Sequence, residues 1–424
     1  MVPRLCIART TWISVVQWPG TAETSSESEW HGGSDDDFVL FVEQTKQAPT
    51  FVSATLADRL KSLAQELGFA QLGIAPAVTP TGFHRLLEWI DNGHSADMQW
   101  IERRKEAYRH PDGVMSGTRS VIMAAMNYND GAEPAAGGRI ARYAWGSADY
   151  HDVLKPRLQS LADLLRTESP SVRTRVVIDT APLLERDFAR LAGIGWFGKN
   201  TMLISRSIGS WFFLGAILTD MELDYDKPVE QNYCGSCTRC LDACPTDAFP
   251  EPGVLDARRC ISYMTIEHRK EPIPVDLRSG VGEWLFGCDI CQDVCPWNRF
   301  APDETLREFQ HLPELNPVSC REFLSLTDEQ FQVRFCDSPL SRPGRAGLLR
   351  NAAIVLGNAR DLSAEPHLIT ALDDADPLIR GAAAWALGQL GSTTAVSALL
   401  SRLSTELNAT VREELARIIE PSGQ

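Results

Sequence analysis

The chain has 424 residues, of which 44% are hydrophobic, and its formal net charge at pH 7 is −15. This length suggests two to three domains, and the composition suffices for real hydrophobic cores. The negative charge argues against indiscriminate binding to nucleic acid, although an acidic protein can still carry a local basic patch. No run of about 18 uncharged apolar residues occurs, so no membrane span is expected.

The N-terminal region has neither a continuous apolar stretch nor a small-residue cleavage site, so a secretory signal is not expected. A cytoplasmic location follows, where thiols stay reduced and clustered cysteines usually bind metal. Residues 1–48 are expected to be a disordered extension, because 21–37 is rich in Ser, Glu, Gly and Asp and has little apolar surface to bury.

From residue 50 to 228, short apolar strands alternate with helical segments, which predicts an α/β domain. The expected helices are 55–67, 83–90, 153–165 and 182–191, and the expected strands are 70–74, 120–126, 174–178, 202–204 and 211–218. The glycine-rich stretch 193–198 follows a helix, where glycines permit tight turns or close approach to a large ring. No G-x-G-x-x-G follows a strand, so a Rossmann dinucleotide site is not indicated.

Cysteines dominate residues 229–300, and 301–340 is expected to be a connecting segment with short helices. The C-terminal part, 341–420, contains a repeat: 350–357 (RNAAIVLG) resembles 380–388 (RGAAAWALG), and a weaker third copy begins near Val411. This pattern is typical of HEAT-like helical repeats. A generic helical hairpin without a binding role is the alternative.

The most specific signal is Cys234-x2-Cys237-x2-Cys240-x3-Cys244-Pro, which is the bacterial ferredoxin pattern for a [4Fe–4S] cluster. In such proteins the fourth cysteine binds the other cluster. A second group, Cys260 and Cys288-x2-Cys291-x3-Cys295-Pro, completes the arrangement. One cluster is therefore assigned to Cys234, Cys237, Cys240 and Cys295, and the other to Cys244, Cys260, Cys288 and Cys291. Two structural zinc sites are the alternative, but zinc ribbons usually show two separated C-x2-C pairs.

Five segments make the sequence similar to the epoxyqueuosine reductase family: 142–151 (RYAWGSADYH), 177–182 (VIDTAP), 193–200 (GIGWFGKN), 256–263 (DARRCISY) and 287–299 (GCDICQDVCPWNR). The resemblance extends over about 52–415. It implies an α+β multidomain protein with an α/β cobalamin-binding domain, a ferredoxin-like domain with two clusters, and HEAT-like α-helical repeats. It also implies reduction of epoxyqueuosine to queuosine at the wobble position of tRNA, the last step of queuosine synthesis.

The resemblance places the proton donor at Asp179, a residue that would otherwise be interpreted as a helix N-cap. A carboxylic acid can donate a proton near neutral pH only if burial or a neighbour raises its pKa. The expected cobalamin contacts are Ala141, Asp179, Leu203, Leu214, Ser262, Cys288 and Asp289. The expected tRNA contacts are Arg186 and His268, the latter in a basic turn with Arg269 and Lys270.

Three further expectations concern isolated residues. His151 lies in a segment that resembles a cobalt-ligating D-x-H-x-x-G loop, but Leu154 replaces the glycine, so His151 is interpreted as structural. Tyr108 stands where the family often has an arginine, which puts one cofactor contact in doubt. Cys6, Cys320 and Cys336 are expected to be ordinary thiols.

The repeat arginines Arg342, Arg345, Arg350 and Arg380 are candidates for phosphate contacts, unless they pair with Asp373, Asp374 and Asp376. An external electron donor such as a flavodoxin or ferredoxin is expected, and the protein is expected to be a monomer. Two other functions stay open at this point. One is a cobalamin-dependent reductive dehalogenase; the other is a ferredoxin-type electron carrier with a docking module.

Overall fold

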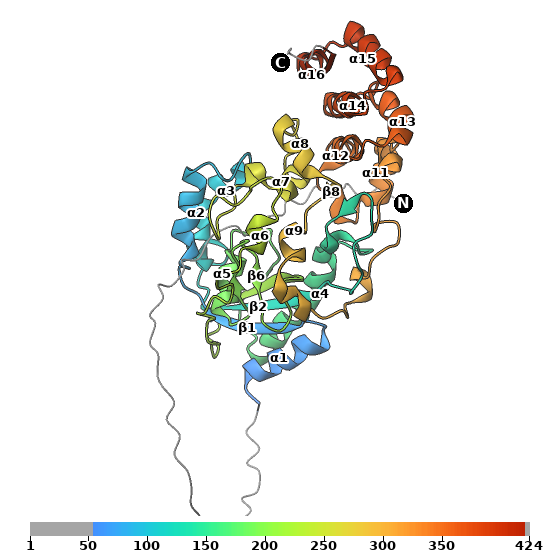
Figure 1. Ribbon diagram of the computed structural model, residues 1–424. Helices are drawn as coiled ribbons and strands as arrows, with labels where there is room; N and C mark the ends of the chain where they lie inside the picture. The colour runs from blue at the N-terminus through green and yellow to red at the C-terminus, as the bar shows by residue number, and fades with distance from the viewer. Residues whose placement is uncertain (1–53, 420–424) are drawn as a thin grey trace, which may run out of the picture.

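The computed structural model describes residues 54–419 (Figure 1). The expected extension 1–48 and Cys6 lie outside this range. The helices are α1 (Leu56–Glu66), α2 (Gly82–Asp91), α3 (Gln99–Arg103), α4 (Tyr150–Glu168), α5 (Glu185–Leu191), α6 (Arg239–Asp242), α7 (Ile261–Ile266), α8 (Val275–Val281), α9 (Ile290–Asp293), α10 (Cys320–Leu324), α11 (Asp328–Phe335), α12 (Gly344–Ala359), α13 (Glu365–Ala371), α14 (Pro377–Leu390), α15 (Thr393–Thr405) and α16 (Ala409–Ile419). The strands are β1 (Gln71–Pro76), β2 (Ser120–Asn127), β3 (Arg139–Ile140), β4 (Thr174–Val177), β5 (Trp196–Phe197), β6 (Leu203–Ile204), β7 (Phe212–Thr219) and β8 (Trp284–Phe286). None of the helices within 54–419 is long and apolar enough to cross a membrane.

Four strands form the central sheet in the order β1-β2-β7-β4, and every neighbouring pair is antiparallel. The prediction of an α/β domain is therefore wrong in this respect, because α/β domains are built on parallel strands. Helices and strands do alternate along the chain, as the apolar pattern predicted. The pattern cannot distinguish parallel from antiparallel pairing, since a strand covered on both faces reads as a continuous apolar run in either case.

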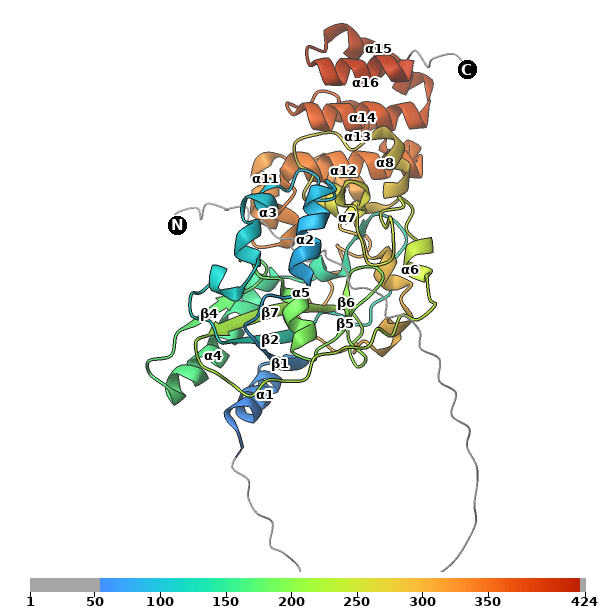
Figure 2. The same cartoon turned by 90° about the vertical axis from the view of Figure 1, so that its left-hand side faces the viewer.

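All residues of strand β2 are buried, because both faces of the sheet are covered. Ile122, Ala124 and Met126 belong to the core shared with α1 and α4. The alternate residues Val121, Met123 and Ala125 belong to the core shared with α5. Successive side chains of a strand point to opposite faces, so the sheet has helices on both sides. Figures 1 and 2 show α1 below the sheet and α5 above it.

The glycines of 193–198 serve a tight hairpin rather than a nucleotide site. Gly193 follows α5 with φ +79°. A Cβ on Gly195 would lie 2.3 Å from the carbonyl oxygen of Ile204. These glycines let β5 and β6 pair closely, and β6 begins at Leu203.

The repeats are not separate from the cluster region, because one core runs through both. Arg350 of α12 is 1% exposed and donates hydrogen bonds to the carbonyl oxygens of Met264, His268 and Glu271, at 2.5 to 3.1 Å. Asn351 bonds the carbonyl oxygens of Thr265 and Leu285. The helices α12, α14 and α16 then stack outward in Figures 1 and 2. Removing the repeats would therefore expose the core beside α7 and β8.

Candidate active site

A cavity that is open in part to solvent lies beside the central sheet. Because β7 is antiparallel to both β2 and β4, its first residues lie next to the last residues of those two strands. Phe212 to Leu214 of β7, Tyr128 after β2 and Asp179 after β4 therefore reach the same edge. The opposite wall comes from the cysteine-rich region through Cys260, Cys288 and Cys291.

The structure brings together every residue that was expected to contact cobalamin. The cavity lining includes Ala141, Asp179, Leu203, Leu214, Ser262, Cys288 and Asp289. They come from six separate segments of the sequence. Arg186, the first expected tRNA contact, also lines this cavity and donates a hydrogen bond of 2.7 Å to the carbonyl oxygen of Thr201. Burial lowers the pKa of Arg186 to about 10, which leaves it a cation at neutral pH.

Asp179 is held by its backbone and by both carboxylate oxygens. Its φ of +43° lies in the left-handed region, which costs a non-glycine residue about 1–2 kcal/mol. Its N–H donates to Oε1 of Glu185 at 2.6 Å. The phenol of Tyr150 donates to one carboxylate oxygen, and Nε2 of His151 lies 2.7 Å from the other. These contacts fix the carboxyl group at the cavity wall despite the backbone strain.

His151 connects Asp179 to a buried charge network. Its Nδ1 lies 2.6 Å from Oδ1 of Asp149, and Arg342 donates to the other oxygen of Asp149 at 3.3 Å. Burial lowers the pKa of His151, but the hydrogen bonds and charges of Asp149 and Asp179 outweigh it and raise the pKa to about 9. The imidazole is then protonated at neutral pH and donates from both nitrogens.

This network bears on the two predictions for His151. The histidine bonds the expected proton donor, which is compatible with a structural role and also places a proton beside Asp179. Both of its ring nitrogens face carboxylates, so neither is free to ligate cobalt, in line with the rejection of the D-x-H-x-x-G reading.

Glu185 is the second acidic group at the cavity, and it is 3% exposed. Burial and then the charge of Asp179 raise its pKa to about 8. Glu185 is therefore mostly neutral at pH 7, although one of its oxygens still accepts the N–H of Asp179. Pro182 disfavours helical backbone at Ala181, and α5 begins at Glu185.

The eight motif cysteines lie near one another, and their division into two sets of four stays a prediction. Burial, and then the charges of Cys234, Cys295 and Cys237, raise the pKa of Cys240 to about 11, so these four thiols are neighbours. In the other set, Cys260 interacts with Cys244, and Cys288 with both Cys260 and Cys291. Cys291 also interacts with Cys240, so the two sets are neighbours. Cys260, Cys288 and Cys291 line the cavity, which makes theirs the inner set.

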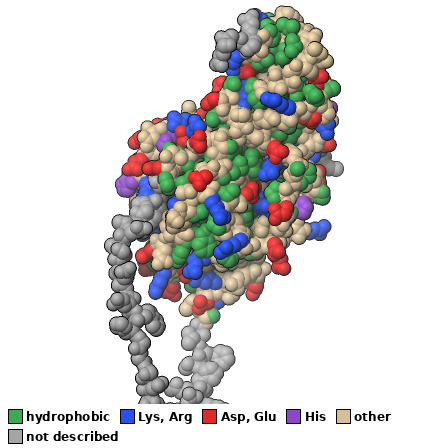
Figure 3. All heavy atoms as spheres, in the orientation of Figure 1, with side chains coloured by type: hydrophobic (Ala, Val, Ile, Leu, Met, Phe, Trp, Pro, Cys, Tyr) green, Lys and Arg blue, Asp and Glu red, His purple; other side chains and the backbone are tan. Residues whose placement is uncertain are grey.

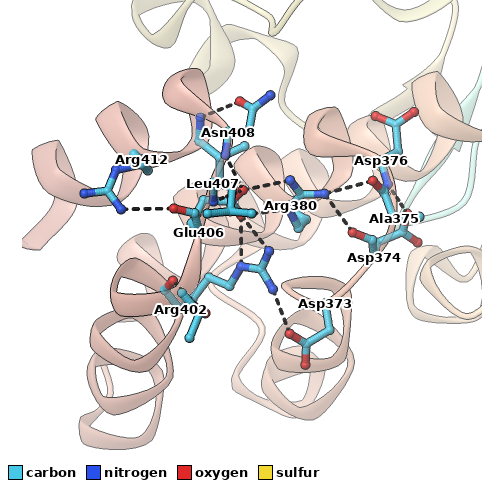
Figure 4. A network of polar contacts seen from close by, with 12 residues as sticks. Asp373, Asp374, Ala375, Asp376, Arg380, Arg402, Glu406, Leu407, Asn408 and Arg412 are labelled. Atoms are coloured by element: carbon cyan, nitrogen blue, oxygen red, sulfur yellow. Dashed lines mark hydrogen bonds and ion pairs between the residues drawn. The ribbon is translucent and has the colours of Figure 1, made fainter.

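The repeat arginines are engaged inside the protein, which contradicts their expected role as phosphate contacts. Arg342 and Arg350 are 2% and 1% exposed, and Arg345 pairs with Asp374 at 2.6 Å. Arg380 donates two hydrogen bonds to Glu406 and bonds the carbonyl oxygens of Asp374 and Ala375 (Figure 4). Arg402 joins Glu406 and Asp373 in the same network. Arg380 thus caps the loop that precedes its own helix α14.

His268 is half-buried and engaged, with Nδ1 at 3.3 Å from Asp97 and Nε2 at 3.2 Å from the carbonyl oxygen of Pro272. Lys270 beside it is exposed. The turn thus lies at the surface, although the His268 ring is turned inward.

The chain also matches known proteins. Three family models match: "Epoxyqueuosine reductase QueG, DUF1730" over 109–180, "4Fe-4S double cluster binding domain" over 233–298, and "HEAT repeats" over 345–420. Epoxyqueuosine reductase of Xanthomonas campestris is 39% identical over 347 residues, which are 79% of this chain and 96% of the relative. The chain belongs to the epoxyqueuosine reductase family. The family member of Escherichia coli is 37% identical over 79% of this chain and 89% of its own.

Solved structures of epoxyqueuosine reductase share this fold. One, in complex with an epoxyqueuosine-modified tRNA-Tyr stem loop, has a TM-score of 0.81 and 32% identity, and the match covers 86% of this chain and 98% of the other. Another, from Bacillus subtilis, has an aspartate catalytic loop swung out of the active site, with a TM-score of 0.79 and the same identity. Family membership decides against the dehalogenase and the electron carrier that the sequence had left open.

Sequence reasoning missed Tyr150, Glu185 and the pairing of His151 with Asp179. A signal was present for two of them, since Asp149-Tyr150-His151 begins a helix and an N-cap aspartate fixes the side chains of the first turn. Glu185 had no such signal, because only the turn at Asp179 folds it back onto the backbone six residues earlier.

Proposed function

We propose that this protein reduces the epoxide of epoxyqueuosine in tRNA to the alkene of queuosine. The reaction takes up two electrons and two protons and releases water. The observation that carries the proposal is the position of Asp179. Its carboxyl group, supplied with a proton by His151, lines the same cavity as three cysteines of the inner cluster set. A proton source and an electron source therefore meet at one cavity.

The cavity fits the cobalamin that the family uses. Leu203, Leu214 and Phe212 offer apolar surface for the faces of a large ring. Polar groups at its border, including Ser262 and Asp289, suit the amide side chains at the edge of a corrin. When bound, cobalamin supplies a strongly reducing cobalt centre for the epoxide carbon.

The two cluster sets define a direction for electron transfer. Cys260, Cys288 and Cys291 line the cavity, whereas Cys234 and Cys237 flank the exposed residues Gly235 and Ser236. An external carrier such as a flavodoxin or ferredoxin therefore delivers electrons to the outer cluster. Cys291 is a neighbour of Cys240 in the outer set, so the inner cluster can accept these electrons. Because Cys291 also lines the cavity, the inner cluster then passes them on to it.

The proton path runs through side chains of this chain. In the resting network Asp179 accepts both of its hydrogen bonds, so the proton starts on Nε2 of His151. It passes to Oδ1 of Asp179, and Asp179 delivers it to the epoxide oxygen as the carbon–oxygen bond breaks. Asp149 and Arg342 keep the imidazole oriented. Tyr150 and Glu185 hold the carboxyl group and its backbone in place. General acid catalysis of this kind typically contributes about 10²- to 10⁴-fold.

The substrate must present its modified base outside a helix to enter the cavity. Bases in single-stranded RNA loops can be splayed out and read individually, as the wobble base of an anticodon can. Arg186 on the cavity wall is placed to contact the inserted nucleotide, and the turn that contains His268 and Lys270 contacts the surrounding loop. We expect the protein to act as a cytoplasmic monomer.

The experiment that tests this function compares substrates under one set of reducing conditions. Protein reconstituted anaerobically with iron, sulfide and cobalamin is supplied with an artificial reductant. We expect queuosine from epoxyqueuosine-containing tRNA and no halide from brominated phenols. Halide release without queuosine would overturn the proposal.

A further inference from the structure

The α3 helix and the turn after it carry three consecutive cations, Arg103, Arg104 and Lys105. Arg103 and Arg104 are exposed and Lys105 is half-buried. Within residues 54–419, none of the three forms an ion pair, and Arg103 donates only to the amide oxygen of Gln99 at 2.8 Å. Glu102 and Glu106 flank them, but Glu106 is already paired with Arg109 at 2.8 Å. The segment therefore offers unpaired positive charge on an acidic protein.

Two contacts place this segment at the edge of the active-site cavity. The guanidinium of Arg104 points at the carbonyl oxygen of Thr180, at 3.4 and 3.5 Å, and Thr180 directly follows Asp179. Asp97, just before α3, bonds His268 and the phenol of Tyr263. The segment thus lies between the loop that carries Asp179 and Thr180 and the basic turn 268–270. Figures 1 and 2 show α3 beside α2, and Figure 3 shows Lys, Arg and Asp or Glu side chains together around the place of these two helices.

We infer that Arg103, Arg104 and Lys105, here called the α3 rim, bind backbone phosphates of the tRNA anticodon loop. The inference rests on the proposed function, in which tRNA is the substrate. A base inserted to the depth of Asp179 brings the phosphates of its own and neighbouring nucleotides to the border of the cavity. Flexible Lys and Arg side chains at that border can follow the backbone without reading sequence.

The charge distribution favours this surface over the repeats. The net charge of −15 repels a polyanion, so binding needs local cations that carboxylates do not already neutralise. In the repeats, Arg345, Arg380 and Arg402 are paired with carboxylates. The α3 rim has no such pairing and lies beside the catalytic loop, where a phosphate contact also orients the base.

The test measures tRNA affinity of the holoprotein with the double substitution Arg103→Gln and Lys105→Gln. Their side chains hold no described element in place, so the fold should survive. We expect the Kd for epoxyqueuosine tRNA to rise about tenfold or more. The slope of log K against log salt should fall by about 1.4, or about 0.7 for each lost contact to single-stranded RNA. At saturating tRNA, kcat should stay near that of the wild type.

Lys227→Gln is the control for loss of a surface cation, because Lys227 is exposed and lies on a different part of the molecule. Its neighbour Asp226 bonds Ile74 of β1, far below α3 in Figures 1 and 2. An unchanged Kd and salt slope in the double variant would overturn the proposed role of the α3 rim in tRNA binding. That failure is distinct from failure of the proposed function, which would appear as a wild-type protein that forms no queuosine.

Discussion

The Nε2 atom of His151 lies 2.7 Å from Oδ1 of Asp179. Asp149 holds the other ring nitrogen at 2.6 Å, so the imidazole lies between two carboxylates and carries a proton at neutral pH. The catalytic acid therefore has a reserve proton at hydrogen-bond distance, buried away from solvent. Two predictions concern this pair.

The first prediction is that His151→Gln lowers kcat by about 10- to 100-fold, because Asp179 must then regain its proton from solvent. The amide preserves a hydrogen bond to Asp179 but cannot supply a proton. Turnover should be measured with saturating tRNA and reductant, with iron content and the cobalamin spectrum as controls. Wild-type turnover in this variant would mean that His151 only supports the fold.

The second prediction concerns pH and stability. The folded-state pKa of His151 is raised from 6.5 to about 9. Its stabilisation is therefore complete below about pH 6.5 and is lost as the pH rises through 9. The pKa of Glu185 is raised from 4.5 to about 8, so its ionisation also lowers the stability of the fold as the pH rises. We expect the melting temperature of the wild type to fall more steeply from pH 6.5 to 9 than that of His151→Gln. Parallel curves would contradict the assigned protonation.

The third prediction separates the roles of Glu185. Its Oε1 accepts the N–H of Asp179, whose backbone is strained at φ +43°. Glu185→Gln retains this acceptor and should keep kcat within a few-fold of wild type. Glu185→Ala removes it, and we expect kcat to fall about 10-fold or more while KM for tRNA changes little. Faster hydrogen exchange at residues 178–181 in the alanine variant alone would show that the loop has been released.

The fourth prediction concerns the repeats. Arg380→Met leaves Glu406 with fewer partners, which should lower the free energy of unfolding by about 3 kcal/mol. The affinity of the folded protein for tRNA should not change. Chemical denaturation and tRNA titration of the same preparation provide both numbers. Weaker tRNA binding without loss of stability would show instead that Arg380 contacts tRNA.

The sequence predicted most of the elements because their apolar periodicity is strong. The expected strand 120–126 is β2 to within one residue, and the helix expected at 153–165 lies within α4. It could not predict the antiparallel sheet, since pairing direction leaves no trace in a doubly covered strand. The double-cluster region was predictable because ligand spacing along the chain is fixed by cluster geometry.

Charge pairing was the property that sequence could least predict. Arg350 and Arg380 open similar helices and look like surface cations, yet the fold uses both to satisfy buried carbonyl oxygens or carboxylates. By contrast, no sequence motif distinguishes Arg104, although its guanidinium reaches the carbonyl oxygen of Thr180 next to Asp179. Which cations stay free depends on contacts between segments more than 70 residues apart.

The most direct test of the account is an anaerobic single-turnover assay of wild type and Asp179→Asn on epoxyqueuosine-containing tRNA. Both proteins should hold about eight iron and eight labile sulfide, the content of two [4Fe–4S] clusters, together with one cobalamin. Nucleosides are digested and quantified by mass spectrometry. We predict conversion of epoxyqueuosine to queuosine by the wild type and a rate lower by about two orders of magnitude or more in Asp179→Asn. Equal rates in the two proteins, or no queuosine from fully loaded wild type, would contradict the account.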